Sequence, residues 1–335
     1  MAGGATGSVR VGLIANPASG KDIRRLTAYG SVVDNEGKVA LVRRILLGVK
    51  AVGVREVLYL PDYYGIVPRA YEGLSREDRA GLHLSPVPVP LTGTPEDSTR
   101  GAAFLAAQGV KPIVVVGGDG TNRVVARGTC EVPLLPVSTG TNNVFPYQCE
   151  STLAGIAAGL AARGLLGEGC FFRAKVIEVF RGGERVDLAL IDAAVLRGPF
   201  VGARAVWDPG ELRRLVLTCA RPGCLGLSSI GACLAPLSHL EGGGLVVEFG
   251  RGQEVLAPIA PGLVCAVPVR GWRRLGFGEE VKSGRGPAVV ALDGEREIEL
   301  LPGEELSLVV SSRGPLVLDL PRALEEAARK RLLWL

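Results

Sequence analysis

An uninterrupted apolar run, Pro112 to Val116, passes directly into the sequence Gly117-Gly118-Asp119-Gly120-Thr121, and helical residues follow from Asn122 to Arg127. Apolar strands without polar alternation are typical of the centre of a parallel sheet, where helices cover both faces. Glycines at the end of such a strand let backbone N–H groups converge on a phosphate, and the start of the next helix adds its positive end. The segment therefore predicts an α/β domain that binds phosphate groups.

Two other apolar runs end in small polar loops. Val9 to Ala15 leads into Asn16-Pro17-Ala18-Ser19-Gly20-Lys21, and Val132 to Val137 leads into Ser138-Thr139-Gly140-Thr141-Asn142-Asn143. In doubly wound sheets, ligands bind at the edge where the carboxyl ends of the strands meet. We therefore expect the three loops to lie together at one edge.

Asp119 is a carboxylate within a loop that suits phosphate. Such a group would repel a phosphate unless it meets Mg²⁺ or takes the proton of a hydroxyl group. The alternative is a glycine-rich turn in which Asp119 only caps the following helix. The residues alone leave both interpretations open.

Beyond about residue 170 the strand–helix rhythm gives way to short apolar-alternating segments separated by glycine turns. This pattern predicts an antiparallel β-sandwich. We expect a helix within it over Asp208 to Ala220, capped by Asp208, a continuous segment over Asp187 to Leu196, and a final helix over Pro321 to Leu333.

Composition excludes several classes of function. The formal net charge of +4 is small and no run of five basic residues occurs, so we expect no nucleic-acid partner. The chain has only two histidines, and its seven cysteines lack the paired spacing of a zinc site. No apolar run approaches the length of a membrane helix and the first residues do not form a signal peptide, so we expect a cytoplasmic protein without membrane contact.

The loop sequences resemble those of the superfamily of diacylglycerol, sphingosine and NAD kinases. The resemblance rests on Asn16-Pro17-x-Ser19-Gly20, on Gly117 to Thr121 and on Gly140-Thr141-x-Asn143. In the second half, Asp293-Gly294-Glu295 is similar to the Asp-Gly-Glu of the lipid kinases, and Ala189-Leu190-Ile191-Asp192 falls where NAD kinases carry Asn-Glu or Asn-Asp. Ile191 departs from that pattern, because NAD kinases place an asparagine there.

Across nearly the whole chain, the sequence is similar to the acetoin-catabolism protein X family, an ATP–NAD-kinase-like group. The shared segments are Ala15 to Arg25, Asp34-Asn35, Thr141 to Phe145 and Phe200 to Arg204. The family's name records an association with acetoin-cleaving operons and does not identify a reaction.

The resemblance implies a fold like that of NAD and diacylglycerol kinases. An N-terminal three-layer α/β nucleotide-binding domain would span residues 1–148, and a C-terminal antiparallel β-sandwich domain for the substrate would span 149–315. The last helix, within 316–335, would pack back on the first domain. The implied activity is transfer of a phosphoryl group from a nucleotide to a hydroxyl of a small soluble metabolite, in the cleft between the domains.

The resemblance also implies roles for individual residues. ATP would be held with Mg²⁺, and Asp119 would bind the metal or act as the base. The competing bases are Asp192 and Asp293, although Asp293-Gly294 is also a strong hairpin signal. The residues implied in nucleotide binding are Asn16, Ser19, Gly20, Lys21, Gly117, Gly118, Gly120, Thr121, Thr141, Asn142 and Asn143.

Several alternatives remain open at this level. The chain could be an NAD kinase, which Ile191 disfavours, or a nucleotide-binding regulator without activity. The acceptor, the donor (ATP, ADP or polyphosphate) and association into a homo-oligomer are not determined by the residues.

Overall fold

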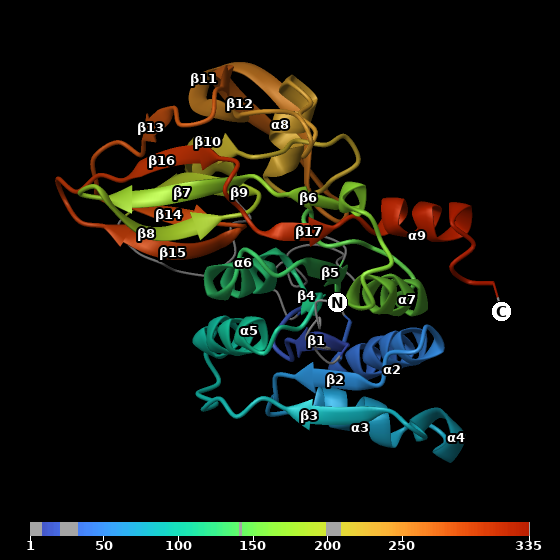
Figure 1. Cartoon of the computed structure of the whole chain (residues 1–335). Helices are drawn as coiled ribbons and strands as arrows, with labels where there is room; N and C mark the ends of the chain where they lie inside the picture. The colour runs from blue at the N-terminus through green and yellow to red at the C-terminus, as the bar shows by residue number, and fades with distance from the viewer. Residues whose placement is uncertain (1–8, 21–32, 141–142, 199–208, 335) are drawn as a thin grey trace, which may run out of the picture.

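The computed structural model describes residues 9–20, 33–140, 143–198 and 209–334. Lys21, Thr141 and Asn142, which the sequence implicated in nucleotide binding, lie outside these ranges, as does the segment Phe200 to Arg204. The described chain forms an α/β unit and a β-rich unit that lie side by side (Figure 1).

The α/β unit is built on a seven-stranded sheet. Six of its strands run parallel, and only β6 is antiparallel to its neighbour β17. β4 is buried at every residue, as expected for a central strand covered on both faces. In sheet order the strands are β3 (His83–Pro86), β2 (Glu56–Tyr59), β1 (Arg10–Ala15), β4 (Ile113–Gly117), β5 (Leu134–Ser138), β17 (Leu316–Leu318) and β6 (Phe171–Arg173).

Helices cover both faces of this sheet, which gives the expected three layers. One face packs against α5 (Glu96–Ala107) and α6 (Asp119–Gly128). The other face packs against α2 (Asn35–Ala51), α3 (Ile66–Glu72) and α7 (Ser151–Ala162). The short helix α4 (Arg76–Arg79) precedes β3, and α9 (Leu320–Arg329) lies beside α7 (Figure 1).

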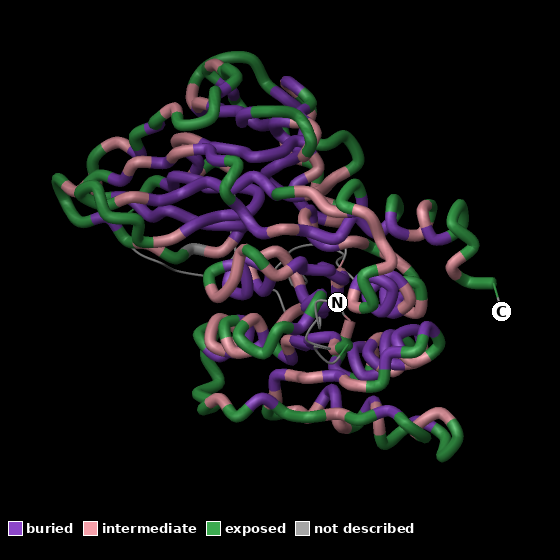
Figure 2. Tube along the Cα trace, viewed as in Figure 1, coloured by how far each residue is buried: buried purple, intermediate pink, exposed green. Residues whose placement is uncertain are grey.

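The β-rich unit consists of two antiparallel sheets with an apolar core between them. Figure 2 shows this core as buried chain that runs through the middle of both sheets. In sheet order, the six-stranded sheet contains β12 (Leu263–Leu275), β11 (Gly244–Ala260), β10 (Leu212–Leu217), β9 (Asp192–Arg197), β14 (Ala288–Leu292) and β15 (Glu295–Leu300). The four-stranded sheet contains β13 (Glu280–Lys282), β16 (Ser307–Ser311), β7 (Val176–Arg181) and β8 (Glu184–Ala189). The helix α8 (Ser228–Leu234) packs on the outer face of the larger sheet. The expected α/β plus β-sandwich fold is confirmed.

Two local predictions differ from the structure. The helix expected over Asp208 to Ala220 is wrong: within the described residues a short 3-10 turn, Pro209–Glu211, leads into strand β10. Asp208-Pro209-Gly210 resembles a helix start, but the apolar residues that follow pair with β9 and β11. The segment Asp187 to Leu196 is divided into β8 and β9 by a turn at Leu190 and Ile191.

The segment between the two units packs with the α/β unit. α7 lies against α2, and β6 completes the first sheet, although both fall within residues 149–315, which were expected to form the substrate domain. None of the helices in the described ranges is long and apolar enough to cross a membrane.

Candidate active site

The three strand-end loops meet at one edge of the first sheet. β1 and β4 are neighbours at the point where the strand order 3-2-1-4-5 reverses, which is the usual ligand site of doubly wound sheets. Nδ2 of Asn16 donates to Oγ1 of Thr121 at 2.8 Å, and Oγ1 of Thr139 donates to Oγ of Ser19 at 3.0 Å. The first loop is therefore hydrogen-bonded to both of the others.

A buried lysine holds the first loop in place. Lys38, on the first turns of α2, has no exposed surface, and its ammonium group donates to the carbonyl oxygens of Pro17 at 3.1 Å and Ser19 at 2.6 Å. It also donates to Oδ1 of Asn35 at 3.1 Å. Since a buried charge requires several such partners, Lys38 fixes the loop strongly.

Two glycines of the second loop are required by close contacts. A Cβ on Gly117 would lie 2.6 Å from Cβ of Thr121, and one on Gly118 would lie 2.8 Å from Oδ1 of Asn143. The glycines thus allow the start of α6 to fold back on β4 and the third loop to approach the second. Any larger residue would push these loops apart.

Asp119 connects the second loop to the third. Its carboxylate accepts the backbone N–H of Phe145 at 2.8 Å and that of Val144 at 3.1 Å. The N-cap position of α6 is occupied by Gly118, so the Asp119 carboxylate reaches across the site while its backbone begins the helix. Asp119 therefore positions the third loop, whatever further role it has.

Asp293 occupies the hairpin that the sequence predicts, between β14 and β15, with a left-handed φ of 51°. Its carboxylate accepts the backbone N–H of Ile191 at 2.7 Å and that of Leu190 at 3.0 Å. Its own N–H donates to the carbonyl of Asp192 at 2.9 Å. One hairpin thus fixes the turn that joins β8 to β9.

The environment of Asp293 favours its protonated form. Complete burial of the side chain and the neighbouring carboxylate of Asp192 together raise the pKa of Asp293 to about 8. Arg123 and the N–H of Leu190 act in the opposite direction but do not cancel the effect. A buried carboxyl group whose pKa lies near neutral pH suits proton transfer.

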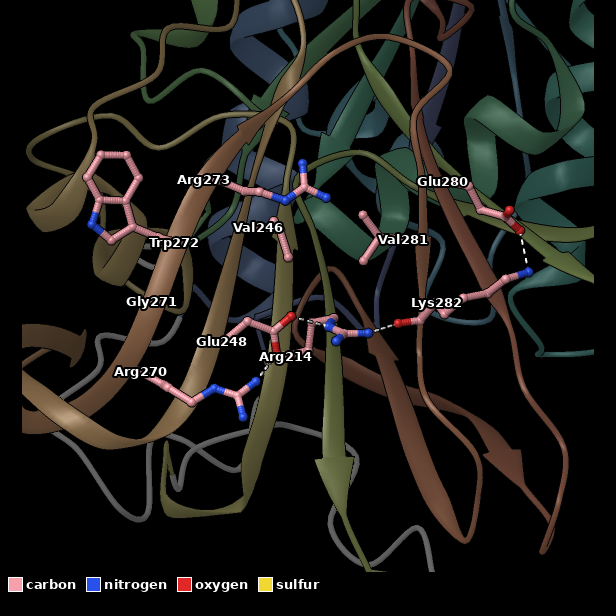
Figure 3. A pocket seen from close by; sticks show the side chains of 10 residues that line it. All are labelled: Arg214, Val246, Glu248, Arg270, Gly271, Trp272, Arg273, Glu280, Val281 and Lys282. Carbon is pink, nitrogen blue, oxygen red and sulfur yellow. Dashed lines mark hydrogen bonds and ion pairs between the residues drawn. The ribbon is translucent and has the colours of Figure 1, made fainter.

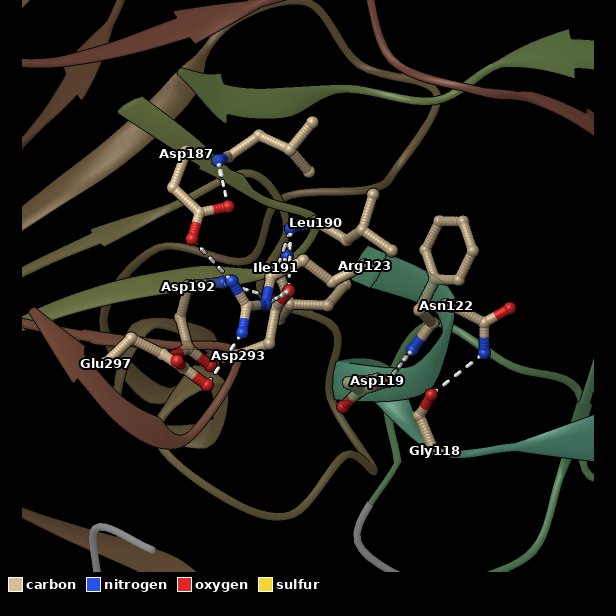
Figure 4. Close-up of polar contacts among 12 residues, drawn as sticks. Gly118, Asp119, Asn122, Arg123, Asp187, Leu190, Ile191, Asp192, Asp293 and Glu297 are labelled. Atoms are coloured by element: carbon tan, nitrogen blue, oxygen red, sulfur yellow. Dashed lines mark hydrogen bonds and ion pairs between the residues drawn. The ribbon is translucent and has the colours of Figure 1, made fainter. Parts of the chain in front are cut away.

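Arg123 links the two units. This residue of α6 is almost fully buried, and it contacts Asp187 at 2.9 Å, Glu297 at 2.7 Å and Asp293 at 4.0 Å (Figure 4). The start of α6 also lies close to the second unit, since a Cβ on Gly120 would be 3.3 Å from Oε1 of Glu295. The glycine loop therefore faces the acidic end of the β14–β15 hairpin.

The described residues contain no group of three or more His, Cys, Asp or Glu side chains arranged to hold a metal ion. Mg²⁺ does not need such a group, because one or two carboxylates plus the phosphates of a substrate commonly hold it. Glu295 beside the phosphate-suited start of α6 fits this mode of binding, since its charge would otherwise repel phosphate. Asp119, with its oxygens already accepting backbone N–H groups, fits it less well.

A cavity of about 260 Å³ lies beside the third loop. Its walls come from the loop at 143–148, from β6, from the β8–β9 turn and from the segment after β10. The peptides held by Asp119 and by Asp293 both form part of these walls.

A second, more open hollow of about 400 Å³ lies on the far side of the sandwich, over β10 to β13 (Figure 3). Its basic residues are matched by acidic ones: Arg214 and Arg270 contact Glu248, and Lys282 contacts Glu280. It shares no residue with the strand-end loops.

Sequence reasoning found most of the polar residues at this edge but missed two. Lys38 interrupts the apolar face of its helix, which is the signal that could have revealed a buried lysine. Arg123 follows the second loop directly, but its acidic partners lie up to 174 residues away. Asp119, Asp192 and Asp293 lie near one another at the start of α6, at the start of β9 and in the β14–β15 hairpin, and their chemical roles remain predictions.

The fold is NAD-kinase-like, with an α/β domain joined to antiparallel sheets. Residues 11–164 match the ATP-NAD kinase N-terminal domain, and residues 175–313 match the acetoin catabolism protein X C-terminal domain. Acetoin catabolism protein X of Cupriavidus necator is 37% identical over 335 residues, covering 96% of this chain and 93% of that protein. The chain belongs to the acetoin catabolism protein X family.

A solved structure shares this fold at low sequence identity, and a second is similar over much of the chain. Yeast NADH kinase complexed with NADH is 14% identical with a TM-score of 0.52, covering 96% of this chain and 87% of that one. An NAD kinase from Archaeoglobus fulgidus in complex with ATP is 16% identical with a TM-score of 0.40, covering 83% of this chain and 99% of that one.

Proposed function

We propose that this protein is a nucleotide-dependent kinase that phosphorylates a hydroxyl group of a small metabolite. The observation that carries the proposal is the hydrogen-bonded junction of three strand-end loops, placed at the switch point of the sheet and facing the buried pair Asp192 and Asp293. Phosphoryl transfer depends on positioning and electrostatics more than on covalent help from the protein, and this arrangement supplies both.

ATP is the proposed donor. Its phosphates would rest on the backbone N–H groups of Gly117 to Thr121 and on Asn16, Ser19 and Gly20. The match of residues 11–164 to the ATP-NAD kinase domain supports ATP over ADP or polyphosphate. Asn143, whose Nδ2 donates to Ser138 at 2.9 Å, would contact the sugar or the phosphates.

Glu295 and Asp119 are the residues that would hold Mg²⁺ together with these phosphates. When bound, the metal offsets the negative charge that develops on the transferred group.

In the proposed reaction, the acceptor hydroxyl oxygen forms a bond to the γ-phosphorus as the bond to the β,γ-bridging oxygen breaks, and ADP leaves. The hydroxyl proton passes to a carboxylate. Asp192 and Asp293 are the proposed bases, because their carboxyl groups are buried beside each other and the pKa of Asp293 is raised to about 8.

Two alternatives come from the resemblance. An NAD kinase is disfavoured by Ile191, a buried apolar side chain whose N–H is already held by Asp293. A regulator that binds nucleotide without turnover would not require the pair of Asp192 and Asp293, and this pair favours an enzyme.

The test is phosphorus NMR of ATP incubated with the protein, Mg²⁺ and a panel of small hydroxyl compounds. A new phosphate-ester signal and stoichiometric ADP support the proposal. Asp192→Asn and Asp293→Asn should lower the rate by about 10²- to 10⁴-fold. ATP that binds tightly but is never consumed, with any acceptor on the panel, would favour the regulator.

A further inference from the structure

The cavity beside the third loop has an unusual balance of charge. None of the described residues that line it carries a carboxylate. Three of them carry basic side chains, namely Lys175, Arg221 and His239. The hollow on the far side of the sandwich differs in this respect, since its cations are paired with glutamates. The inner cavity therefore carries a positive potential that its own walls do not offset.

Lys175 supplies charge to this cavity but no free donor. The residue is buried, and its ammonium group donates to the carbonyl oxygens of Ser238 at 3.0 Å, Glu241 at 2.7 Å and Gly243 at 3.1 Å. These bonds fix the turn that carries His239. Burial lowers the pKa of Lys175 to about 8, so the group is still mostly charged at neutral pH.

Arg221 is the lining cation with donors to spare. Its Nη2 donates to the carbonyl of Val144 at 2.9 Å, which ties the segment after β10 to the third loop. A guanidinium group has about five N–H donors in a planar fork that suits carboxylate and phosphate oxygens. Because Arg221 is exposed, it lies where a ligand can reach it from solvent.

The rest of the cavity is largely apolar and small. Phe145, Phe172, Leu190 and Ile191 contribute to its walls. Its volume of about 260 Å³ has room for a ligand of the size of a small organic acid. A dinucleotide is several times larger.

The cavity lies directly beside the proposed bases. Leu190 and Ile191 form one wall, and the N–H groups of these same residues are the ones that the Asp293 carboxylate accepts. The turn held by the Asp293 carboxylate is thus part of the cavity wall, and Asn143 of the third loop, a proposed nucleotide contact, lines the same cavity.

We propose that this cavity binds a small organic anion with a short apolar body, and that this anion is the hydroxyl-bearing acceptor of the phosphoryl group. Arg221 binds its carboxylate or phosphate, Lys175 adds to the potential, and the aromatic and aliphatic walls contact its carbon chain. The role as acceptor rests on the proposed kinase function, whereas the anion site stands without it.

The test is calorimetric binding of two compounds that share a carbon chain, 2-hydroxyhexanoate and 1,2-hexanediol, to the full chain without nucleotide. A hydrogen bond to a charged group is worth about ten- to hundredfold in affinity, so the hydroxy acid should bind tighter than the diol by about that factor. Arg221→Gln should remove most of this difference. Arg251→Gln, which makes the same charge change at an exposed residue of β11 that does not line the cavity, should preserve it.

A second measurement locates the ligand. The chain has two histidines, His239 in the cavity and His83 exposed on β3, so NMR of labelled histidine gives two signals. Burial lowers the pKa of His239, and Arg221 and Lys175 lower it further. A bound anion should raise the pKa of His239 and leave that of His83 unchanged.

Three results would each overturn the inference. They are an equal affinity for the two compounds, an affinity for the hydroxy acid that Arg221→Gln does not change, and a pKa of His239 that the ligand does not alter. Phosphorylation of neutral hydroxyl compounds alone, without anion binding, would overturn it and leave the kinase proposal intact. Anion binding at His239 with no phosphoryl transfer to any bound anion would support the site and remove its role as an acceptor site.

Discussion

Oδ1 of Asp293 lies 2.7 Å from the backbone nitrogen of Ile191, so the residue at the tip of one hairpin determines the shape of the turn between two other strands. The same turn forms a wall of the inner cavity. Asp119 does the same for the third loop: its carboxylate accepts the N–H of Phe145, a residue that also lines the cavity. Two of the three carboxylates that the sequence singled out for catalysis are therefore also structural anchors, and mutations must separate the two roles.

The stability of the protein should depend on the titration of Asp293. Because its pKa is about 8 in the folded protein and about 3.8 in an ordinary aspartate, the folded state holds a proton that the unfolded state releases. This contribution is complete below about pH 4 and is lost as the pH rises toward about 8, with a slope of up to about 1.4 kcal/mol per pH unit. Urea unfolding of wild type and Asp293→Asn across this range measures it. If the free energy of unfolding had the same pH dependence in both proteins, the raised pKa of Asp293 would be contradicted.

Asp119→Asn should weaken the third loop. An amide in place of the carboxylate directs an N–H donor at the N–H of Val144 or Phe145, with an expected loss of about 1 to 3 kcal/mol in the free energy of unfolding. Asp97→Asn is the matched control, since Asp97 likewise accepts the backbone N–H groups of Thr92 and Gly93. Both variants should lose stability, but only Asp119→Asn should lose nucleotide affinity and turnover. Equal turnover in the two variants would place Asp119 outside the active site.

Lys38→Met should loosen the first loop. The carbonyl oxygens of Pro17 and Ser19 would lose a charged donor. For each oxygen that water does not reach, we expect a loss of about 1 to 3 kcal/mol in the free energy of unfolding. We expect a lower affinity for ATP, measured by calorimetry, because Ser19 and Gly20 are proposed to contact its phosphates. Lys50→Met, at the exposed end of the same helix, should leave that affinity unchanged. Wild-type affinity in the Lys38 variant would show that the loop is not needed for nucleotide binding.

NAD should be a poor acceptor. Ile191 presents an apolar side chain where NAD kinases carry an amide, and a polar group of the dinucleotide buried against it would lack a partner. We expect kcat/KM for NAD at least about tenfold below that for a small hydroxyl acceptor, since an unsatisfied polar group costs about 1 to 3 kcal/mol. The assay is NADP formation by the purified protein. Efficient NADP formation would make the protein an NAD kinase.

Much of the fold could be predicted from local sequence. Val114, Val115 and Val116 form an apolar strand because they lie between two helical layers, and the glycines after them end that strand at the sheet edge. Such patterns are local in the chain, so the sequence displays them directly. The wrong helix at β10 shows the limit, because pairing with β9 and β11 overrides an Asp-Pro-Gly start that resembles a helix cap.

The site was harder to predict because its contacts join distant segments. The sequence singles out Asp119 and Asp293 as candidates, but their backbone partners at Phe145 and Ile191 carry no side-chain signal. The cavity itself has no motif, since its walls come from both units.

Hydrogen exchange of the backbone amides, measured with and without ATP and Mg²⁺, tests the proposed nucleotide site most directly. The proposal predicts slower exchange in residues 117–121 and in Ser19 and Gly20, with little change in the sandwich strands away from the β14–β15 hairpin. Protection confined to other segments, or no binding of ATP at millimolar concentration, would contradict it.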